Sequence, residues 1–133
     1  MLSSYRGNSG AASPSTSGKA ILVTLSDVPT QEPITIAFAD SPYTIANTDV
    51  SAIRTFLVST AGGAVTINLP AVPFDGEIVT IKRTTPDGTA LTIGRNGKNI
   101  EGAAANFSDA NAGLSSYQFQ YDSTSGSWWW IGG

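Results

Sequence analysis

The chain has 133 residues, of which only 13% are charged, and a formal net charge of -3 at pH 7. This acidic, charge-poor composition argues against nucleic acid or an anionic membrane as the partner, because both require clustered Lys and Arg. Cys and His are absent, which excludes disulfides, thiolate or imidazole metal sites, and Ser-His-Asp or Cys-His catalysis. The first residues lack the apolar segment of a signal peptide, so we expect synthesis in the cytoplasm without one.

Residues 1–19, MLSSYRGNSGAASPSTSGK, form an arm rich in Gly, Ser and Ala. Such a segment cannot by itself bury enough surface to offset the entropy lost on ordering. It is either a flexible tail or an anchor that lies extended in a groove of a larger protein and adds backbone hydrogen bonds. Gly and Ser permit close backbone approach, and we expect the anchor, with Leu2, Tyr5, Arg6 and Lys19 as its contact residues.

From residue 20 onward, apolar and polar residues alternate with the period of two that is typical of β-strands. The runs that predict strands are, in chain order, 20–25, 34–40, 41–46, 54–60, 64–70, 77–83, 90–94, 116–122 and 127–131. In the run AVTINLP, Val65, Ile67 and Leu69 alternate with polar residues, and Ile81 occupies a similar place in EIVTIKR. We therefore expect these four side chains in the core.

Turn residues separate these runs. Asp-Gly or Asn-Gly pairs occur in FDGE, TPDGT and RNGKN, where Gly supplies the positive φ that tight turns require. TTPDGTA is interpreted as a hairpin loop between its two flanking strands, and DSTSGS as a longer one. One-turn helices capped by Asn47 and Asp109 are the longest helical pieces expected. The prediction is an all-β fold: a compact antiparallel β-sandwich or barrel-like domain over residues 20–133, with an extended N-terminal arm.

The last two predicted strands, SYQFQYD and SWWWI, concentrate aromatic side chains. In a regular strand Trp128 and Trp130 point to the same, inner side, and we assign both to the core; Trp129 then faces the opposite side. Alternating aromatics usually pack in a core or at a subunit seam, whereas sugar-binding platforms use exposed ones. The candidates for a subunit interface or a glycan contact are Trp129, Tyr117, Phe119 and Tyr121.

Carboxylates are the remaining candidates for catalytic residues. A glycosidase, for example, needs two of them about 5–10 Å apart. The candidates are Asp49, Asp75, Glu77, Asp87, Glu101 and Asp109. Those that precede Gly are turn residues, Asp49 and Asp109 fit turns or caps, and Glu77 and Lys82 fit strand-edge charges. The adjacent Lys82 and Arg83 are interpreted as a solvated strand end. No EF-hand spacing is present, and we expect no enzymatic activity, no metal and no cofactor.

The order of motifs in the second half follows a family pattern. It comprises a Gly pair, VTI-x-LP, a Gly turn, x-I-x-IK, a strand ending in TI, G-x-x-I-x-G, an alternating strand, and a Gly turn before Trp. Here these are Gly62-Gly63, 65–70, Gly76, 78–82, 91–93, Gly97, 100–102, 117–121, Gly126 and 128–131. In this pattern residues from about 42 to 133 resemble a β-rich module of tailed-bacteriophage tail-fibre, head-fibre and other virion structural proteins. The resemblance implies a trimeric, structural, non-enzymatic protein. The family pattern usually has one Trp at the end, and this chain has three.

The resemblance leads us to expect a virion structural protein on the outer surface of a phage particle, made in the host cytoplasm. A chain of this length starting at Met1 favours a trimeric head decoration, cement or head-fibre protein, anchored to the major capsid protein by its arm, over a complete tail fibre. One alternative is a tail-fibre or baseplate accessory protein bound to a tail or baseplate protein. Another is a carbohydrate-binding module that attaches the particle to a host glycan. Nucleic acid and membrane are not expected as partners.

Overall fold

A computed structural model describes residues 32–50, 52–111 and 113–133 of the chain. The chain divides into two units, Met1–Thr30 and Gln31–Gly133, and the described residues all belong to the second. The predicted arm, with Leu2, Tyr5, Arg6 and Lys19, and the strand predicted at 20–25 lie outside the described residues.

The described part of the chain is built almost entirely of strands, so the all-β prediction is confirmed. The elements are β1 (Ile34–Ile36), the 3-10 helix η2 (Phe38–Asp40), β2 (Tyr43–Thr44), β3 (Ile53–Val58), β4 (Val65–Asn68), β5 (Ile78–Arg83), β6 (Leu91–Gly94), β7 (Asn99–Ile100), β8 (Phe107–Asp109), β9 (Ser116–Asp122) and β10 (Ser127–Gly132). Both one-turn helices expected near Asn47 and Asp109 are wrong as helices: residues 49–50 form a bend, and Asp109 ends β8.

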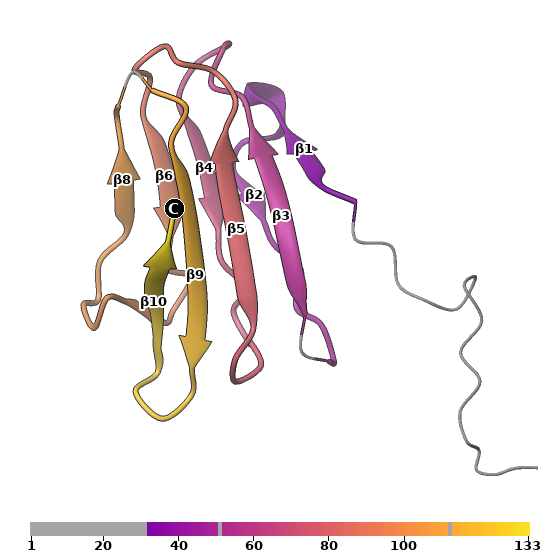
Figure 1. Cartoon of the computed structure of the whole chain (residues 1–133), viewed down its shortest axis with the longest axis vertical. Helices are drawn as coiled ribbons and strands as arrows, with labels where there is room; N and C mark the ends of the chain where they lie inside the picture. Colours follow the sequence, from indigo (N-terminus) through magenta and orange to yellow (C-terminus); the bar gives the residue numbers. More distant parts are fainter. Residues whose placement is uncertain (1–31, 51, 112) are drawn as a thin grey trace, which may run out of the picture. The chain divides into compact units, whose positions relative to one another are not determined.

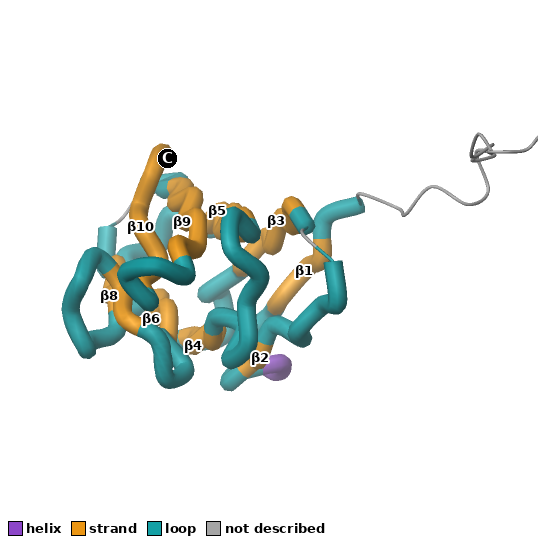
Figure 2. Tube along the Cα trace, turned by 90° about the horizontal axis from the view of Figure 1, so that it is seen from below, coloured by secondary structure: helices purple, strands orange, loops and turns teal. Residues whose placement is uncertain are grey.

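The strands form two sheets that face each other as layers (Figure 2). The larger sheet has the order β1-β3-β5-β9-β10-β7, and the smaller sheet has the order β2-β4-β6-β8. Successive strands from β1 to β6 alternate between the two sheets, so each connection crosses from one layer to the other. Figure 1 shows β3, β5 and β9 side by side, with β4, β6 and β8 in the other layer.

Strand direction differs from the predicted antiparallel arrangement. β1, β3 and β5 run parallel to one another, and so do β2, β4 and β6. Among the strands of the described residues, antiparallel pairing is confined to β5 with β9, β9 with β10, and β6 with β8, and one isolated antiparallel bridge joins Ile100 to Ala103. The loop TTPDGTA consequently joins strands of different sheets and is not a hairpin, whereas DSTSGS does join the antiparallel pair β9 and β10.

The parallel strands stack as the coils of a solenoid do. In the larger sheet Ile34 pairs with Phe56, and Phe56 pairs with Ile81. In the smaller sheet Val65 pairs with Leu91. The chain therefore returns to the same sheet, with an inward-facing residue above an inward-facing residue, after about two dozen residues. This spacing is in the range of solenoid repeats. Stacking like residues above one another buries a continuous core that no single coil could bury alone.

The core lies between the two sheets and consists of the inward residues of the period-two pattern. Val65, Ile67, Leu69 and Ile81, which the sequence assigns to the core, are all fully buried there. Tyr43 of β2 meets Phe56 of β3 across the layers, with ring centroids 6.1 Å apart. Many side chains on the outward positions, such as Thr66, Thr80 and Gln118, are polar and partly exposed, which explains the alternation in the sequence.

The paired glycines of the family-like pattern have a steric role in this fold. The ring of Phe38, in η2, lies against Gly62 and Gly63. A Cβ atom on Gly63 would come within 2.7 Å of that ring, and the residue has φ +146, a region that favours glycine. The glycine pair therefore allows η2 to approach the turn that follows β3.

Candidate functional site

The last strand, β10, carries one buried and three exposed large side chains in succession. Trp128 is fully buried and lies beside Tyr121, with ring centroids 5.3 Å apart. Trp129, Trp130 and Ile131 are 38%, 46% and 49% exposed. Trp129 pairs with Gln120 on the outer face of the larger sheet, which is the side that the alternation predicts.

Trp130 differs from its predicted place in the core. Its ring is on the inner side, with centroids 5.6 Å from Phe107 and 5.5 Å from Tyr117. Phe107 of β8 covers part of the ring, and the side chain stays 46% exposed. Beyond Trp128, β10 has no pairing with β7. Trp130 therefore closes the open side of the core and remains accessible to solvent.

The aromatic residues of β9 lie in the core. Phe119 is fully buried, and Tyr117 and Tyr121 are nearly so. Phe107 of β8 touches two of them edge-on, with centroids 4.8 Å from Tyr117 and 5.8 Å from Phe119. Of the four residues considered for a subunit or glycan contact, Trp129 alone has a substantially exposed side chain; Tyr117, Phe119 and Tyr121 pack in the core, the alternative that the sequence also offered for alternating aromatics.

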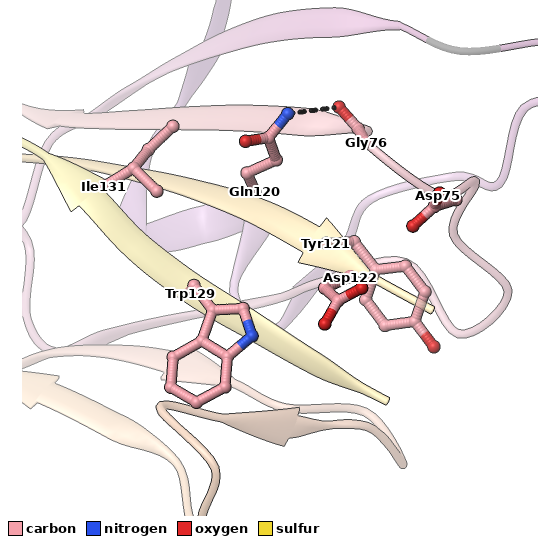
Figure 3. A pocket seen from close by; sticks show the side chains of 7 residues that line it. All are labelled: Asp75, Gly76, Gln120, Tyr121, Asp122, Trp129 and Ile131. Atoms are coloured by element: carbon pink, nitrogen blue, oxygen red, sulfur yellow. Dashed lines mark hydrogen bonds between the residues drawn. The ribbon is translucent and has the colours of Figure 1, made fainter. Parts of the chain in front are cut away.

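A hollow of about 390 Å³ lies on the outer face of the larger sheet beside Trp129. Its lining comes from β9, from β10 and from the turn before β5 (Figure 3): Asp75, Gly76, Gln120, Tyr121, Asp122, Trp129 and Ile131. The Gln120 amide nitrogen donates to the carbonyl oxygen of Gly76 at 3.2 Å, and the Asp75 carboxylate accepts from the Ser123 N–H at 2.9 Å. These bonds tie the turn to β9 and keep the hollow in shape.

Side-chain hydrogen bonds from the β9–β10 hairpin fix the indole of Trp129. Its Nε1 donates to Ser125 Oγ at 3.1 Å, and Ser125 Oγ donates to the Asp122 carboxylate at 2.7 Å. The hydrogen bond from Ser125, followed by backbone N–H bonds, holds the pKa of Asp122 below its ordinary value despite some desolvation. Asp122 is therefore ionised at neutral pH and holds the hairpin that positions Trp129.

Arg83 forms a buried polar cluster at the end of β5, and this site was missed in the sequence. The side chain is fully buried. Its Nη1 donates to Thr60 Oγ1 at 2.8 Å and to Asp87 at 3.2 Å, its Nη2 donates to the carbonyls of Thr89 and Asp109, and its Nε faces the Asp109 carboxylate at 3.5 Å. Every nitrogen of the guanidinium thus has a partner, which is what a buried charge requires. The expectation of a solvated strand end is wrong for Arg83.

The two carboxylates of this cluster stay ionised. A hydrogen bond from Thr60, the Thr89 N–H and the Arg83 charge hold the pKa of Asp87 below its ordinary value. Burial would raise the pKa of Asp109, but hydrogen bonds from Ser115 and the Asn111 N–H, together with the Arg83 charge, outweigh it and lower that pKa. Neither group can serve as a general acid near neutral pH, since both have lost their protons.

A second buried ion pair lies where β5 begins. Glu77 is fully buried, accepts from the Phe74 N–H at 3.0 Å and pairs with the guanidinium of Arg54, which also donates to the Ala46 carbonyl at 2.6 Å. The expectation of an exposed strand-edge charge is therefore wrong for Glu77. Glu77 and Arg83 belong to the inward alternation with Val79 and Ile81, and that pattern is the signal that could have located both.

The hydrogen bonds and ion pairs described above connect strands and turns of the fold. Within residues 32–50, 52–111 and 113–133, no group of three or more acidic side chains could hold a metal ion. Glu101, another carboxylate considered for catalysis, accepts from the backbone N–H of Trp130 at 2.6 Å, and Asp75 holds the Ser123 N–H. In the described part of the chain no helix has the length and hydropathy that crossing a membrane requires.

Comparison with protein-family models and with curated proteins gives no match to this chain.

Proposed function

We propose that this chain is a non-enzymatic structural protein of a tailed-bacteriophage virion, acting as a homotrimeric head decoration, cement or head-fibre protein on the outer surface. The observation that carries the proposal is the adjacent exposure of Trp130 and Ile131, which are 46% and 49% accessible on the last strand. Single exposed apolar residues are ordinary on protein surfaces, but large adjacent ones beside a free strand edge are typical of contact surfaces.

The chemistry of these residues favours association between copies. Trp is enriched at interfaces because its large apolar area gains much from burial. Burying one large apolar side chain contributes about 1.5–3 kcal/mol. Leu114, 54% exposed on the loop before β9, adds apolar surface near the end of the sheet where β10 finishes. We define Leu114, Trp130 and Ile131 as the C-terminal apolar surface, and we assign the contact between subunits to it.

The described carboxylates also favour a structural role. Asp87, Asp109 and Glu77 are held by arginines, and Asp122 holds a hairpin. A glycosidase would need one carboxyl group that keeps its proton near neutral pH beside another that does not. The pKa values of Asp87, Asp109 and Asp122 are all lowered, which is the opposite of what a general acid needs.

The test of the trimer is the molecular mass of the full chain in solution. Mass photometry or light scattering at micromolar concentration should give three copies. A molecular mass equal to that of one chain over the whole concentration range would contradict the proposal.

The test of the virion role is attachment to the particle. In the proposal the arm, through Leu2, Tyr5, Arg6 and Lys19, binds the major capsid protein. Deleting residues 1–19 should abolish binding to particles that lack this protein, while circular dichroism of the β unit stays unchanged. Undiminished binding of the truncated chain would show that the anchor lies elsewhere.

A further inference from the structure

We infer that the hollow beside Trp129 binds an uncharged pyranose sugar. This activity goes beyond the proposed structural role, because it uses the outer face of the larger sheet; of the C-terminal apolar surface, Ile131 alone lines the hollow. The hollow, about 390 Å³, falls in the size range of small-ligand sites. One wall is an aromatic ring that is 38% exposed, Ile131 adds a second apolar side chain, and Asp75, Gln120 and Asp122 supply polar groups (Figure 3).

The ring of Trp129 is held in place before any ligand arrives. Its Nε1 is bonded to Ser125, and its far edge lies over Gly102, where a Cβ atom would come within 3.4 Å of the ring. Gly102 has φ +76, so the turn that makes room for the ring favours glycine. A preorganised ring loses little conformational entropy when a ligand covers it, which raises affinity for a flat apolar face.

The polar groups around the ring are chiefly hydrogen-bond acceptors. Asp75 and Asp122 each accept backbone N–H donors, and a carboxylate retains further lone pairs after such bonds. The Gln120 amide nitrogen donates a hydrogen bond to the Gly76 carbonyl, and the amide oxygen is left as an acceptor for a ligand. A ligand suited to this site must donate several hydrogen bonds, as the hydroxyls of a sugar do.

The combination of an aromatic face and acceptors selects the ligand class. A pyranose has a C–H face that can lie on the indole and hydroxyl groups at its rim that can donate to the carboxylates. The lining contains two acidic side chains and no basic one. Carboxylated or sulfated sugars would therefore be repelled, and the geometry points to neutral hexoses or N-acetylhexosamines.

The experiment screens the full-length chain against an array of neutral and sialylated oligosaccharides. Calorimetry with the best soluble monovalent hit then gives the affinity of each site. Binding should be confined to neutral glycans, and Trp129→Ala should weaken it by about tenfold or more. Trp129→Phe should retain part of the affinity, because it keeps the aromatic face.

The matched control is Trp130→Ala, which removes the neighbouring exposed tryptophan on the opposite face. It should leave the affinity per site unchanged, since a monovalent ligand gains nothing from the number of subunits. Melting curves of all variants check folding. No binding by the wild type, preference for sialylated glycans, or equal loss in both alanine variants would overturn the inference. A monomer that binds neutral glycans would keep this inference and contradict the trimer, so the two proposals fail separately.

Discussion

Arg83 and Asp109 meet at the end of the core, where the guanidinium Nη2 donates to the Asp109 carbonyl at 3.0 Å and the Nε faces its carboxylate at 3.5 Å. Arg83 ends β5 in the larger sheet, and Asp109 ends β8 in the smaller one. The pair therefore joins the two layers at the end of the sandwich where β5 finishes. Burying both charges is tolerated because each has several hydrogen-bond partners.

Removing the guanidinium should strongly destabilise the fold. Arg83→Met leaves the carboxylate of Asp109 buried without its counter-charge, and such a change typically costs about 3–5 kcal/mol of unfolding free energy. Urea denaturation measures this loss. The control is Lys82→Met, one residue earlier on the outer side, whose amine contacts the Leu114 carbonyl; it should change stability by about 0.5 kcal/mol or less. Equal effects of the two substitutions would contradict the structural role of Arg83.

Acidification should destabilise the protein through the same cluster. The pKa values of Asp87 and Asp109 are lowered from the ordinary value of 3.8, so these groups stabilise the fold when ionised. Their contribution is fully present above the unfolded-state pKa and is lost as the pH falls through the lower folded-state value. The unfolding free energy should thus show no loss from these groups between pH 7 and about 5 and should fall below about pH 4. Urea midpoints across this range measure it.

Asp109→Asn supplies the comparison for the pH series. The variant should be less stable at pH 7, because it removes the counter-charge of Arg83, and its stability should fall less steeply below about pH 4. A variant that follows the wild-type slope would show that Asp109 does not carry the acid sensitivity.

The three consecutive tryptophans should differ in their contribution to stability. Trp128→Ala leaves a cavity in the core and should cost about 3–5 kcal/mol. Trp130→Ala loses the edge-on contacts with Phe107 and Tyr117, and it should cost about 1–2 kcal/mol. Trp129→Ala removes an exposed ring from the outer face and should cost about 1 kcal/mol or less. Chemical denaturation of the three variants gives the order, and a larger loss at Trp129 than at Trp128 would contradict the assigned faces.

Gly63 should resist substitution for a steric reason. Gly63→Ala places a Cβ atom within 2.7 Å of the Phe38 ring at φ +146, and the strain should cost about 1–3 kcal/mol. Gly113→Ala is the control, because its Cβ would meet nothing within 4 Å. Thermal melting of both variants checks the prediction. A harmless Gly63→Ala would mean that η2 does not lie against this turn.

The alternation of the sequence predicted which face of most strands is buried. It placed Val65, Ile67 and Ile81 in the core, and it separated Trp129 from Trp128 correctly. Applied without regard to charge, the same alternation also places Glu77 and Arg83 inside. The expectation that charged residues lie at the surface outweighed that pattern, because isolated charges are almost never fully buried. Their partners Arg54 and Asp109 are distant in the sequence and could not be identified from it.

Neither the direction of the strands nor the exposed fraction of individual side chains could be predicted from the sequence. Parallel and antiparallel strands share the same period of two, so alternation cannot distinguish a hairpin from a crossover to the other sheet. The Asp87-Gly88 turn illustrates this, because it joins β5 to β6 in different layers. Trp130 points inward as the pattern predicts, but its 46% exposure depends on how the two sheets pack around it, which is a property of the assembled fold.

The measurement that bears most closely on assembly compares the mass of the wild type with that of a variant carrying Trp130→Ser and Ile131→Ser. Sedimentation equilibrium at micromolar concentration should show a trimer for the wild type and a shift towards the monomer for the variant. Its circular dichroism spectrum should remain that of the wild type. A folded variant that stays trimeric, or a wild type that is monomeric, would contradict association through the C-terminal apolar surface.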